Sequence, residues 1–242
     1  MLPRLAIPTY QRYNSISQKT LRYLNEHAYP AYLIYLFVAS EEERVRYEET
    51  VPAHLYGHIV VGVPGLREQR NFITDYFDEG EIIIEMDDDV ESIYCMTGGF
   101  MGLVDHGVKM IKTGNGGLFG CMPNDDKRVM TLTTTTHLAF IIGVFSVRKN
   151  HKAIRISLVQ KQDYERSILY FLQYGTTYRY KGAGVKTRYL KNAGGLQDGH
   201  RLETMEECVA HLCNIYPKLI KRREKNGLPD LLLNWRAKRT SS

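Results

Sequence analysis

Apolar runs alternate with amphipathic segments along the first ninety residues of the chain. Short apolar and β-branched runs predict four strands, at residues 5–8, 33–39, 58–63 and 81–86. Apolar residues at helical spacing and a Ser40/Glu43 capping pair predict three intervening helices, over residues 16–24, after Ser40, and over residues 67–77. Alternating strands and helices are typical of a parallel sheet with helices on its faces, so the predicted fold class is α/β.

The pattern is less regular in the second half of the chain. Residues 98–120 are rich in glycine, and residues 129–136 form a threonine-rich strand or loop. No repeat, low-complexity linker or Pro/Ser-rich hinge divides the chain, so we expect one domain over residues 1–242. Before a basic tail, the pattern predicts a strong strand over residues 138–147 and helices over residues 161–174 and 203–216.

The composition excludes several classes of protein. With 43% hydrophobic and 11% aromatic residues, the 242-residue chain has enough apolar material for a sizeable core, which excludes disorder and disulfide-stapled miniproteins. The longest apolar stretch, of ten residues, is too short to cross a bilayer. The N-terminus lacks a secretory signal, so we expect a soluble cytoplasmic or nuclear protein. The cysteines show no CxxC spacing and are expected to be reduced thiols: Cys95, Cys121, Cys208 and Cys213.

The net charge of +5 conceals a difference between the two halves. Residues 1–121 contain 10 Lys and Arg against 17 Asp and Glu, whereas residues 122–242 contain 22 against 10. A basic half beside an acidic half indicates an anionic partner. Nucleic acid, a nucleotide phosphate and a membrane surface all meet this condition, so charge alone does not choose among them.

A cluster of carboxylates follows the fourth predicted strand. Asp87, Asp88 and Asp89 come directly after a buried apolar run. Ligands of parallel α/β sheets bind beyond the carboxyl ends of the strands, so we expect the cluster at the binding edge. Clustered carboxylates repel one another unless they share a cation, and Mg²⁺ and Mn²⁺ prefer such oxygen ligands. A solvated acidic turn is the alternative.

Polar residues also follow the first and third predicted strands. Thr9 and Arg12 follow the first strand, and Gly65, Arg67 and Arg70 follow the third. The two latter arginines are three residues apart at the start of a helix, so they are expected to share a face and to reach a phosphate or nucleotide. Surface ion pairs along the same helix are the alternative.

The order of these motifs resembles that of a known family. Ile7-Pro8-Thr9-Tyr10-Gln11-Arg12, the segment 65–73 and the triplet followed by Val90 are similar to the motifs of GT-A fold glycosyltransferases with a DxD motif. The resemblance is greatest to the enzymes associated with TET/JBP oxygenases, which include base J glucosyltransferase, and to their viral relatives. Three later segments resemble the acceptor strand, the base-carrying segment and the glycine pair of that family, at residues 140–145, 162–167 and 194–197.

The resemblance implies a GT-A fold, with a Rossmann-like, mostly parallel central sheet flanked by helices. A nucleotide-sugar-binding half would span residues 1–97, and an acceptor-binding half with the basic tail would span residues 98–242. The implied reaction is a metal-dependent, inverting transfer of glucose from UDP-glucose to a hydroxymethylated pyrimidine in DNA, with Mn²⁺ or Mg²⁺ as cofactor. The viral relatives make a virus-encoded protein that acts in a host cell compatible with this pattern.

The resemblance also implies residue roles. The general base, which removes a proton from the acceptor hydroxyl, is Asp163 or Glu165. Many relatives have Glu-Asp where this chain has Gln162-Asp163, so the choice stays open; a helix N-cap is the structural alternative for Asp163. The donor-binding set is Pro8, Thr9, Tyr10, Arg12, Gly65, Arg67, Arg70, Asn71, Asp87 and Asp88. The implied metal ligands are Asp87 and Asp89, and the implied acceptor-binding residues are Gly143, Gly194 and Gly195. From its neighbours Gly199 and Arg201, His200 is a further candidate ligand of the metal or diphosphate, with a solvated loop histidine as the alternative. Lys186 and Arg188, in a basic stretch of the second half, are further candidates for acceptor binding.

Tyrosines interleaved with cations favour DNA as the acceptor. Tyr174, Tyr178 and Tyr180 begin a stretch with Arg179 and Lys181 that could follow a phosphate backbone and stack an extruded base. Tyrosines also stack on sugars, so a glycan or another small hydroxyl compound could be the acceptor instead. A metal-dependent nuclease would also fit the aspartates with their basic flanks, as would a non-catalytic protein that binds a nucleotide sugar or nucleic acid.

Overall fold

The computed structural model describes residues 1–186 and 201–238, without the side chain of Arg201. Within these residues, no helix is both long enough and apolar enough to span a membrane. The strands are β1 (Arg4–Pro8), β2 (Ile34–Val38), β3 (His58–Val61), β4 (Ile82–Met86), β5 (Ser92–Cys95), β6 (Leu118–Met122), β7 (Thr134–His137), β8 (Phe145–Lys149), β9 (Thr177–Lys186), β10 (Ile220–Lys225) and β11 (Leu228–Leu233). The α-helices are α1 (Thr20–Glu26), α2 (Glu41–Thr50), α3 (Leu66–Tyr76), α4 (Gly99–Thr113), α5 (Gln162–Tyr174) and α6 (Arg201–Ile215), and the short 3-10 helices are η1 (Ile16–Gln18), η2 (Ala31–Leu33), η3 (Ala53–Leu55) and η4 (Lys127–Val129).

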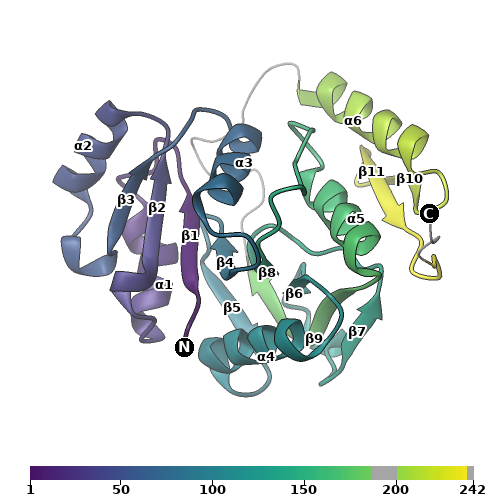
Figure 1. Ribbon diagram of the computed structural model, residues 1–242, viewed down its shortest axis with the longest axis horizontal. Helices are drawn as coiled ribbons and strands as arrows, with labels where there is room; N and C mark the ends of the chain where they lie inside the picture. The colour runs from purple at the N-terminus through teal and green to yellow at the C-terminus, as the bar shows by residue number, and fades with distance from the viewer. Residues whose placement is uncertain (187–200, 239–242) are drawn as a thin grey trace.

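A central sheet joins both halves of the chain, in the order β3-β2-β1-β4-β8-β6-β9-β5, with β7 paired to β9 (Figure 1). β1, β2, β3 and β4 are parallel neighbours. β8 is antiparallel to β4 and to β6, and β9 is parallel to β6. β5 and β7 are antiparallel to β9. Of the nine strands that the described residues contribute to this sheet, six therefore run in one direction, and the predicted mostly parallel α/β sheet is confirmed.

Helices cover both faces of the sheet because successive strand residues point to opposite sides. On one face, Leu5 and Ile7 of β1 pack in the same apolar cluster as residues of α1 and α4. On the other face, Ala6 packs with Ile73 of α3 and with Phe77, which follows this helix. The first ninety residues thus form the strands and helices that their apolar pattern predicts, in the predicted order.

The predicted basic tail contains a hairpin that the apolar pattern did not predict. β10 and β11 are antiparallel and are joined by Asn226 and Gly227, whose φ angles are 54° and 72°. An Asn-Gly pair with two positive φ angles is the signature of a tight type I′ hairpin turn. The hairpin packs with α6 against Tyr164 and Ile168 of α5, around a second apolar cluster.

The predicted strand over residues 138–147 is wrong in its first part, because β8 begins only at Phe145. Residues 138–144 contain no strand, and side chains satisfy the backbone there in place of a neighbouring strand. The amide of Ala139 donates to Thr177 Oγ1 at 2.9 Å, and the amide of Ile141 donates to Ser167 Oγ at 3.0 Å. The apolar residues of this segment are buried without being part of a sheet, as Leu138 and Ile141 illustrate.

Candidate functional site

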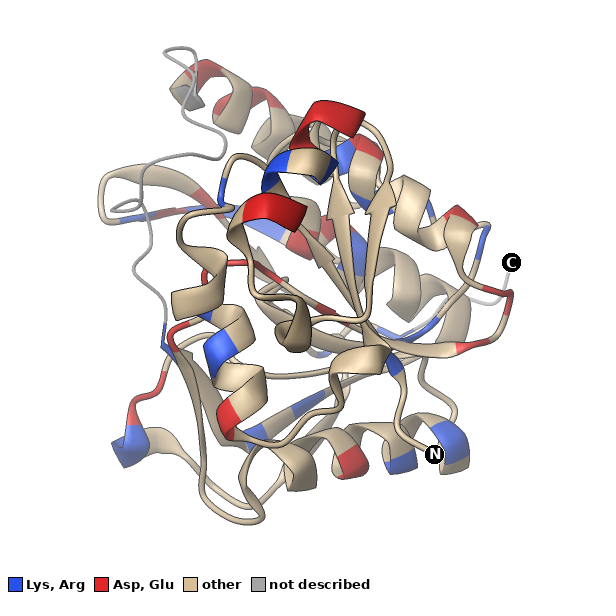
Figure 2. Ribbon diagram, turned by 90° about the vertical axis from the view of Figure 1, so that its left-hand side faces the viewer, with Lys and Arg blue, Asp and Glu red and all other residues tan. Residues whose placement is uncertain are grey.

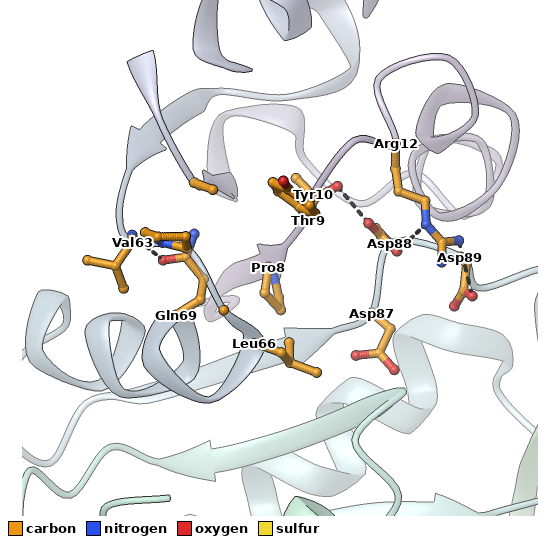
Figure 3. A pocket seen from close by; sticks show the side chains of 13 residues that line it. Pro8, Thr9, Tyr10, Arg12, Val63, Leu66, Gln69, Asp87, Asp88 and Asp89 are labelled. Carbon is orange, nitrogen blue, oxygen red and sulfur yellow. Dashed lines mark hydrogen bonds and ion pairs between the residues drawn. The ribbon is translucent and has the colours of Figure 1, made fainter. Parts of the chain in front are cut away.

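A pocket of about 450 Å³ lies at the carboxyl ends of β1 and β4 and beside the start of α3 (Figure 3). This is the sheet edge at which the strand-end rule places a ligand. The lining includes predicted residues of the donor and metal sets, namely Pro8, Thr9, Tyr10, Arg12, Gly65, Asp87, Asp88 and Asp89. The lining residues that were not predicted are Ala39, Val63, Pro64, Leu66 and Gln69; Ala39 directly follows β2, so the strand-end rule could have found it.

Gln69 and Gly65 shape the wall of the pocket formed by the β3–α3 connection. Gly65 has a φ of 92°, a conformation that a side chain rarely permits, and the residue lies directly before α3. The side chain of Gln69 accepts a hydrogen bond from the Val63 amide at 3.0 Å and donates one to the Val38 carbonyl at 3.0 Å. This buried amide therefore links the β3–α3 connection, at Val63, to the end of β2, at Val38.

The three aspartates point in two directions. Asp88 and Asp89 turn toward Arg12, whereas Asp87 points away from it (Figure 3). Asp88 accepts a hydrogen bond from Thr9 Oγ1 at 2.6 Å and lies 3.9 Å from Arg12 Nε, and Asp89 lies 3.3 Å from Arg12 Nη1. The structure therefore places Asp88 in contact with the end of β1 and Asp89 beside Arg12, while Asp87 faces Arg70.

Burial, together with the neighbouring carboxylates, raises the pKa of two of these aspartates. Burial raises the pKa of Asp87 to about 7, supported by the nearby Asp89 and Asp163 carboxylates and opposed by Arg70. Burial likewise raises the pKa of Asp88 to about 6, against the opposite influence of Arg12 and Thr9. The ionised forms of both side chains are therefore costly, and a bound cation would relieve that cost.

A divalent cation bound by these aspartates would have to share its coordination with a substrate. Among the described residues, no group of three or more His, Cys, Asp and Glu side chains is arranged to hold a metal. Mg²⁺ and Mn²⁺ sites on phosphate substrates commonly use one or two protein carboxylates and complete their coordination with phosphate oxygens and water. Asp87 and Asp89 would supply those two carboxylates. His200, the third predicted ligand, lies outside the described residues.

The predicted common face of Arg67 and Arg70 is wrong. Arg67 lies at the surface, where Nη1 donates to the Ser157 carbonyl at 3.1 Å and the guanidinium pairs with Glu68. Arg70 lies one turn further along α3, over β4, and its side chain is only 5% exposed. The two side chains separate because the first turn of α3 extends past the sheet edge, whereas the second turn packs on the sheet.

Arg70 joins three carboxylates through three different nitrogens. Its Nε lies 3.2 Å from Glu85, Nη2 lies 3.3 Å from Asp87, and Nη1 lies 3.3 Å from Asp163. Nη1 also donates to Gln162 Oε1 at 2.9 Å. Unlike most of the predicted donor residues, Arg70 is absent from the lining of the pocket. It connects the aspartate cluster to the start of α5.

The two candidate bases lie in different surroundings. Asp163 is the second residue of α5, after an N-cap at Lys161, so the N-cap alternative for Asp163 is wrong. The side chain of Asp163 is 25% exposed and faces Arg70. Glu165 is buried and accepts hydrogen bonds from the amides of Ser157 and Leu158 at 3.1 Å. Its carboxylate holds the loop before α5, which is a structural task.

Asn71 also holds this loop and is absent from the pocket lining, contrary to the prediction that it binds the donor. Its Nδ2 donates to the Ile156 carbonyl at 2.8 Å, and its Oδ1 accepts from the Ile156 amide at 2.9 Å. Both ends of the amide are therefore bonded to one residue of the loop. Asn71 comes two residues after Gln69, which lines the pocket, and residues two apart point to nearly opposite sides of a helix. Asn71 therefore faces away from the pocket.

Gly143, just before β8, lies close to the same two side chains. A Cβ at this position would lie 2.5 Å from Asp163 Oδ1 and 2.6 Å from Arg70 Nη2. Glycine is therefore required for the backbone to approach this pair. Lys186 is exposed at the end of β9. The other predicted acceptor residues, Arg188, Gly194 and Gly195, lie outside the described residues.

The predicted aromatic surface on β9 is wrong for the described tyrosines. Tyr178 and Tyr180 are 4% and 9% exposed, and they belong to the core on the α4 face of the sheet. Tyr178 Oη accepts a hydrogen bond from the Gly116 amide at 2.9 Å, and the ring of Tyr180 packs on His106. β9 lies within the sheet, so its alternate residues point into the core and cannot stack a base.

Comparisons with known proteins address the fold. No family model matches the sequence, and no curated protein matches it at a significant level. Similar solved structures include the mannosyltransferase PcManGT from Pyrobaculum calidifontis in complex with GDP-Man and Mn²⁺, at 16% identity and a TM-score of 0.53, covering 90% of this chain and 65% of that chain. Glucosyl-3-phosphoglycerate synthase from Mycobacterium tuberculosis, in complex with phosphoglyceric acid, is 11% identical with a TM-score of 0.53, covering 97% of this chain and 88% of that one.

A third similar structure is GalNAc-T7 with UDP, GalNAc and Mn²⁺, at 11% identity and a TM-score of 0.53. The match covers 78% of this chain and 44% of GalNAc-T7. The chain therefore spans less than two thirds of both the mannosyltransferase and GalNAc-T7. At these identities the likeness concerns the arrangement of the backbone. The fold of the chain is the GT-A fold of glycosyltransferases.

Proposed function

We propose that the protein is a metal-dependent glycosyltransferase that uses a nucleotide-sugar donor. The observation that carries this proposal is the position of Asp87, on the pocket wall and linked through Arg70 to Asp163. A metal-binding carboxylate and a candidate base are thereby held close to one another at the binding edge of a GT-A fold. The nucleotides and Mn²⁺ in the mannosyltransferase and GalNAc-T7 structures support the same assignment.

The donor would lie across the pocket. Its nucleoside fits between the end of β1, at Pro8 to Tyr10, and the β3–α3 connection, and its diphosphate extends toward Asp87 and Asp89. The divalent cation, when bound, neutralises charge on the diphosphate that leaves. Glucose as the sugar and UDP as the nucleotide rest on the sequence resemblance.

Asp163 is the proposed general base. It would take the proton from the acceptor hydroxyl while that oxygen attacks the anomeric carbon of the donor. The bond from the anomeric carbon to the diphosphate breaks, and the nucleotide leaves with the electron pair on the opposite face, so the configuration is inverted. Asp163 is partly exposed and Glu165 is committed to the Ser157–Leu158 backbone, which supports the choice of Asp163.

The proposed acceptor is a hydroxymethylated pyrimidine in DNA. This proposal rests on the order of the sequence motifs and on the exposed Lys186 at the end of β9, the same edge of the sheet as the pocket. A glycan or another hydroxyl compound is the alternative acceptor. The buried Tyr178 and Tyr180 remove one argument that separated DNA from a glycan.

Calorimetry with a panel of UDP- and GDP-sugars, with and without Mn²⁺, tests the donor proposal. We expect one nucleotide sugar to bind in Mn²⁺ and to bind at least tenfold more weakly in EDTA. Asp89→Ala should weaken binding in Mn²⁺ by a similar factor and abolish transfer. Asp105→Ala, which removes an exposed carboxylate on α4, is the matched control and should bind as the wild type does.

Two results would contradict the proposal. One is the absence of binding to every nucleotide sugar in Mn²⁺. The other is full transfer activity in EDTA, or in Asp89→Ala, which would remove the metal assignment. Metal-dependent cleavage of DNA without nucleotide-sugar binding would favour a nuclease.

A further inference from the structure

We propose that Glu85 is a positioning residue, which sets the orientation of Arg70 and through it the relative placement of Asp87 and Asp163. This inference rests on the proposed function. Glu85 lies on β4, two residues before Asp87, and its side chain is 1% exposed. It does not line the pocket, so its effect on the reaction would be indirect.

Glu85 is a buried anion that three guanidinium groups surround. Arg166 Nη2 lies at 2.8 Å, Arg70 Nε at 3.2 Å and Arg148 Nη2 at 3.3 Å from its carboxylate oxygens. These three guanidinium groups offset the cost of burying the carboxylate. An ionised carboxylate in the core is costly unless such partners compensate it, so the anion and its arginines form one unit.

The cluster combines equal numbers of guanidinium and carboxyl groups. Three arginines, Arg70, Arg148 and Arg166, lie among three carboxylates, those of Glu85, Asp87 and Asp163. Arg148 has additional partners, because it donates to Asn150 Oδ1 at 2.7 Å and to Thr74 Oγ1 at 3.3 Å. Arg70 instead lies between the inner carboxylate of Glu85 and the outer carboxylates of Asp87 and Asp163. Its position therefore depends on the balance between them.

The contact between Arg70 and Glu85 depends on charge. Arg70 Nε has no hydrogen-bond partner among the described residues, although it lies 3.2 Å from the Glu85 carboxylate. A neutral glutamine at position 85 keeps the shape of the side chain but loses this attraction. Arg70 would then be drawn outward by Asp87 and Asp163. Because the guanidinium is planar and rigid, an outward shift of Arg70 moves all of its contacts together.

The test compares Glu85→Gln with Arg70→Lys. Lysine keeps the positive charge but cannot reach three carboxylates through three fixed nitrogens. We expect both variants to lose at least tenfold in kcat for sugar transfer, measured per donor-binding site counted by calorimetry. The KM for the nucleotide sugar should change by a smaller factor. Glu85→Asp, which keeps the charge, should recover part of the kcat that Glu85→Gln loses.

Glu81→Gln is the matched control for a structural effect. Glu81 directly precedes β4, at the opposite end from Asp87, and pairs with Arg4. Its replacement removes an ion pair from the same region of the sheet, so it should lower the melting temperature and leave kcat per site unchanged. Counting donor-binding sites removes any contribution from unfolded protein. Arg70→Lys tests the inference even where Glu85→Gln fails to fold.

The inference and the proposed function fail in different ways. If the wild type transfers sugar and both Glu85→Gln and Arg70→Lys keep wild-type kcat per site, Glu85 has no positioning role. Equal kcat values for Glu85→Asp and Glu85→Gln would also overturn the inference, because charge would then be irrelevant. If the wild type binds no nucleotide sugar in Mn²⁺, the proposed function itself is wrong.

Discussion

Gly143 packs closely against two side chains of the candidate site. A Cβ there would contact the tips of two side chains, Asp163 and Arg70, rather than backbone. Side-chain tips move more easily than backbone does, so the substitution should displace the two groups rather than unfold the chain. Gly143→Ala should therefore reduce activity more than stability.

We expect Gly143→Ala to lower kcat by about 10- to 100-fold, because a displacement on the order of 1 Å from a reacting group commonly costs that much. Donor affinity in Mn²⁺ should change by a smaller factor. Gly102→Ala on α4 is the control, since a Cβ there meets nothing closer than the Thr97 carbonyl at 3.8 Å. Steady-state kinetics on both variants decide the matter; equal kcat values would show that Gly143 does not constrain the site.

Replacing Asp163 should mainly lower activity, whereas replacing Glu165 should mainly lower stability. Asp163→Asn should lower kcat by about 10²- to 10⁴-fold, the usual contribution of a general base, with little change in melting temperature. Glu165→Ala should instead lower stability, because the amides of Ser157 and Leu158 lose their acceptor. Kinetics and thermal unfolding measured on both variants test the assignment. A stable Glu165→Ala protein without activity would make Glu165 the base.

At the scale of elements, the loop between β8 and α5 is fastened to its neighbours by side chains. Asn71 on α3 bonds both backbone groups of Ile156, and Glu165 on α5 bonds the two following amides. The loop therefore joins α3 and α5, the helices that carry Arg70 and Asp163. Because the loop is bonded to both helices, it fixes the position of α3 relative to α5.

Asn71→Ala should lower the free energy of unfolding by about 1–3 kcal/mol, because the two backbone groups of Ile156 lose their partners. Urea unfolding measures this loss. The affinity for the nucleotide sugar should stay within about threefold of the wild type, since Asn71 is absent from the pocket lining. A large loss of donor affinity with unchanged stability would instead show that Asn71 binds the donor.

The sequence predicted those elements whose signals are local. The first four strands and their helices were predicted because apolar periodicity and the Ser40–Glu43 cap lie within each element. α4 was missed because its glycines lower helix propensity. One of them, Gly107, is required by packing, since a Cβ there would lie 2.7 Å from Phe119. Such a requirement arises from Phe119 on β6, twelve residues further on, and no local pattern reveals it.

Part of the candidate site was also predicted, again from local signals in the sequence. Residues directly after strands line the pocket, because the strand-end rule needs only the order of elements. The partners of Arg67, Asn71 and Glu165 could not be predicted, because they lie in the loop before α5, about ninety residues from the first two and eight residues from Glu165. Glu85 did leave a signal, as a single charged residue inside an apolar strand, but its partners became known only from the fold.

Across the whole molecule, part of the charge asymmetry is neutralised internally. Arg148 and Arg166, from the basic half, contact Glu85, and Arg155 pairs with Asp75 at 2.5 Å. In the acidic half, α2, the helix nearest the viewer in Figure 2, has acidic residues at both ends and basic residues between them. Within this helix, Arg44 pairs with both Glu41 and Glu48. The sequence count therefore overstates the positive charge that is offered to a partner.

The DNA proposal is best tested through salt dependence. If DNA is the acceptor and about five phosphates are contacted, affinity should fall by on the order of a hundredfold or more between 50 and 200 mM salt. Lys186→Glu should weaken DNA binding and transfer to hydroxymethylated DNA while donor binding is kept. Lys152→Glu makes the same change near the opposite edge of the sheet, beyond the end of β8, and should have little effect.

Fluorescence anisotropy with labelled duplex and single-stranded DNA measures both effects. Transfer to free oligosaccharides, together with an affinity for DNA that does not respond to salt, would exclude DNA as the acceptor. Equal losses in Lys186→Glu and Lys152→Glu would indicate general electrostatic attraction rather than a site at the end of β9.

The pairing of β5 with β9 has a consequence for how the chain folds. β1 to β4 all lie within the first 86 residues and pair with one another, Arg4 of β1 with Ile83 of β4 included, whereas Ser92 of β5 pairs with Lys186, across more than ninety residues. Closing so long a loop costs chain entropy and slows folding. During synthesis the first four strands can associate early, whereas β5 waits until β9 has left the ribosome. We therefore expect the pocket, whose lining lies within residues 8–89, to form first, and a chain that stops before residue 177 to leave β5 unpaired and prone to aggregation.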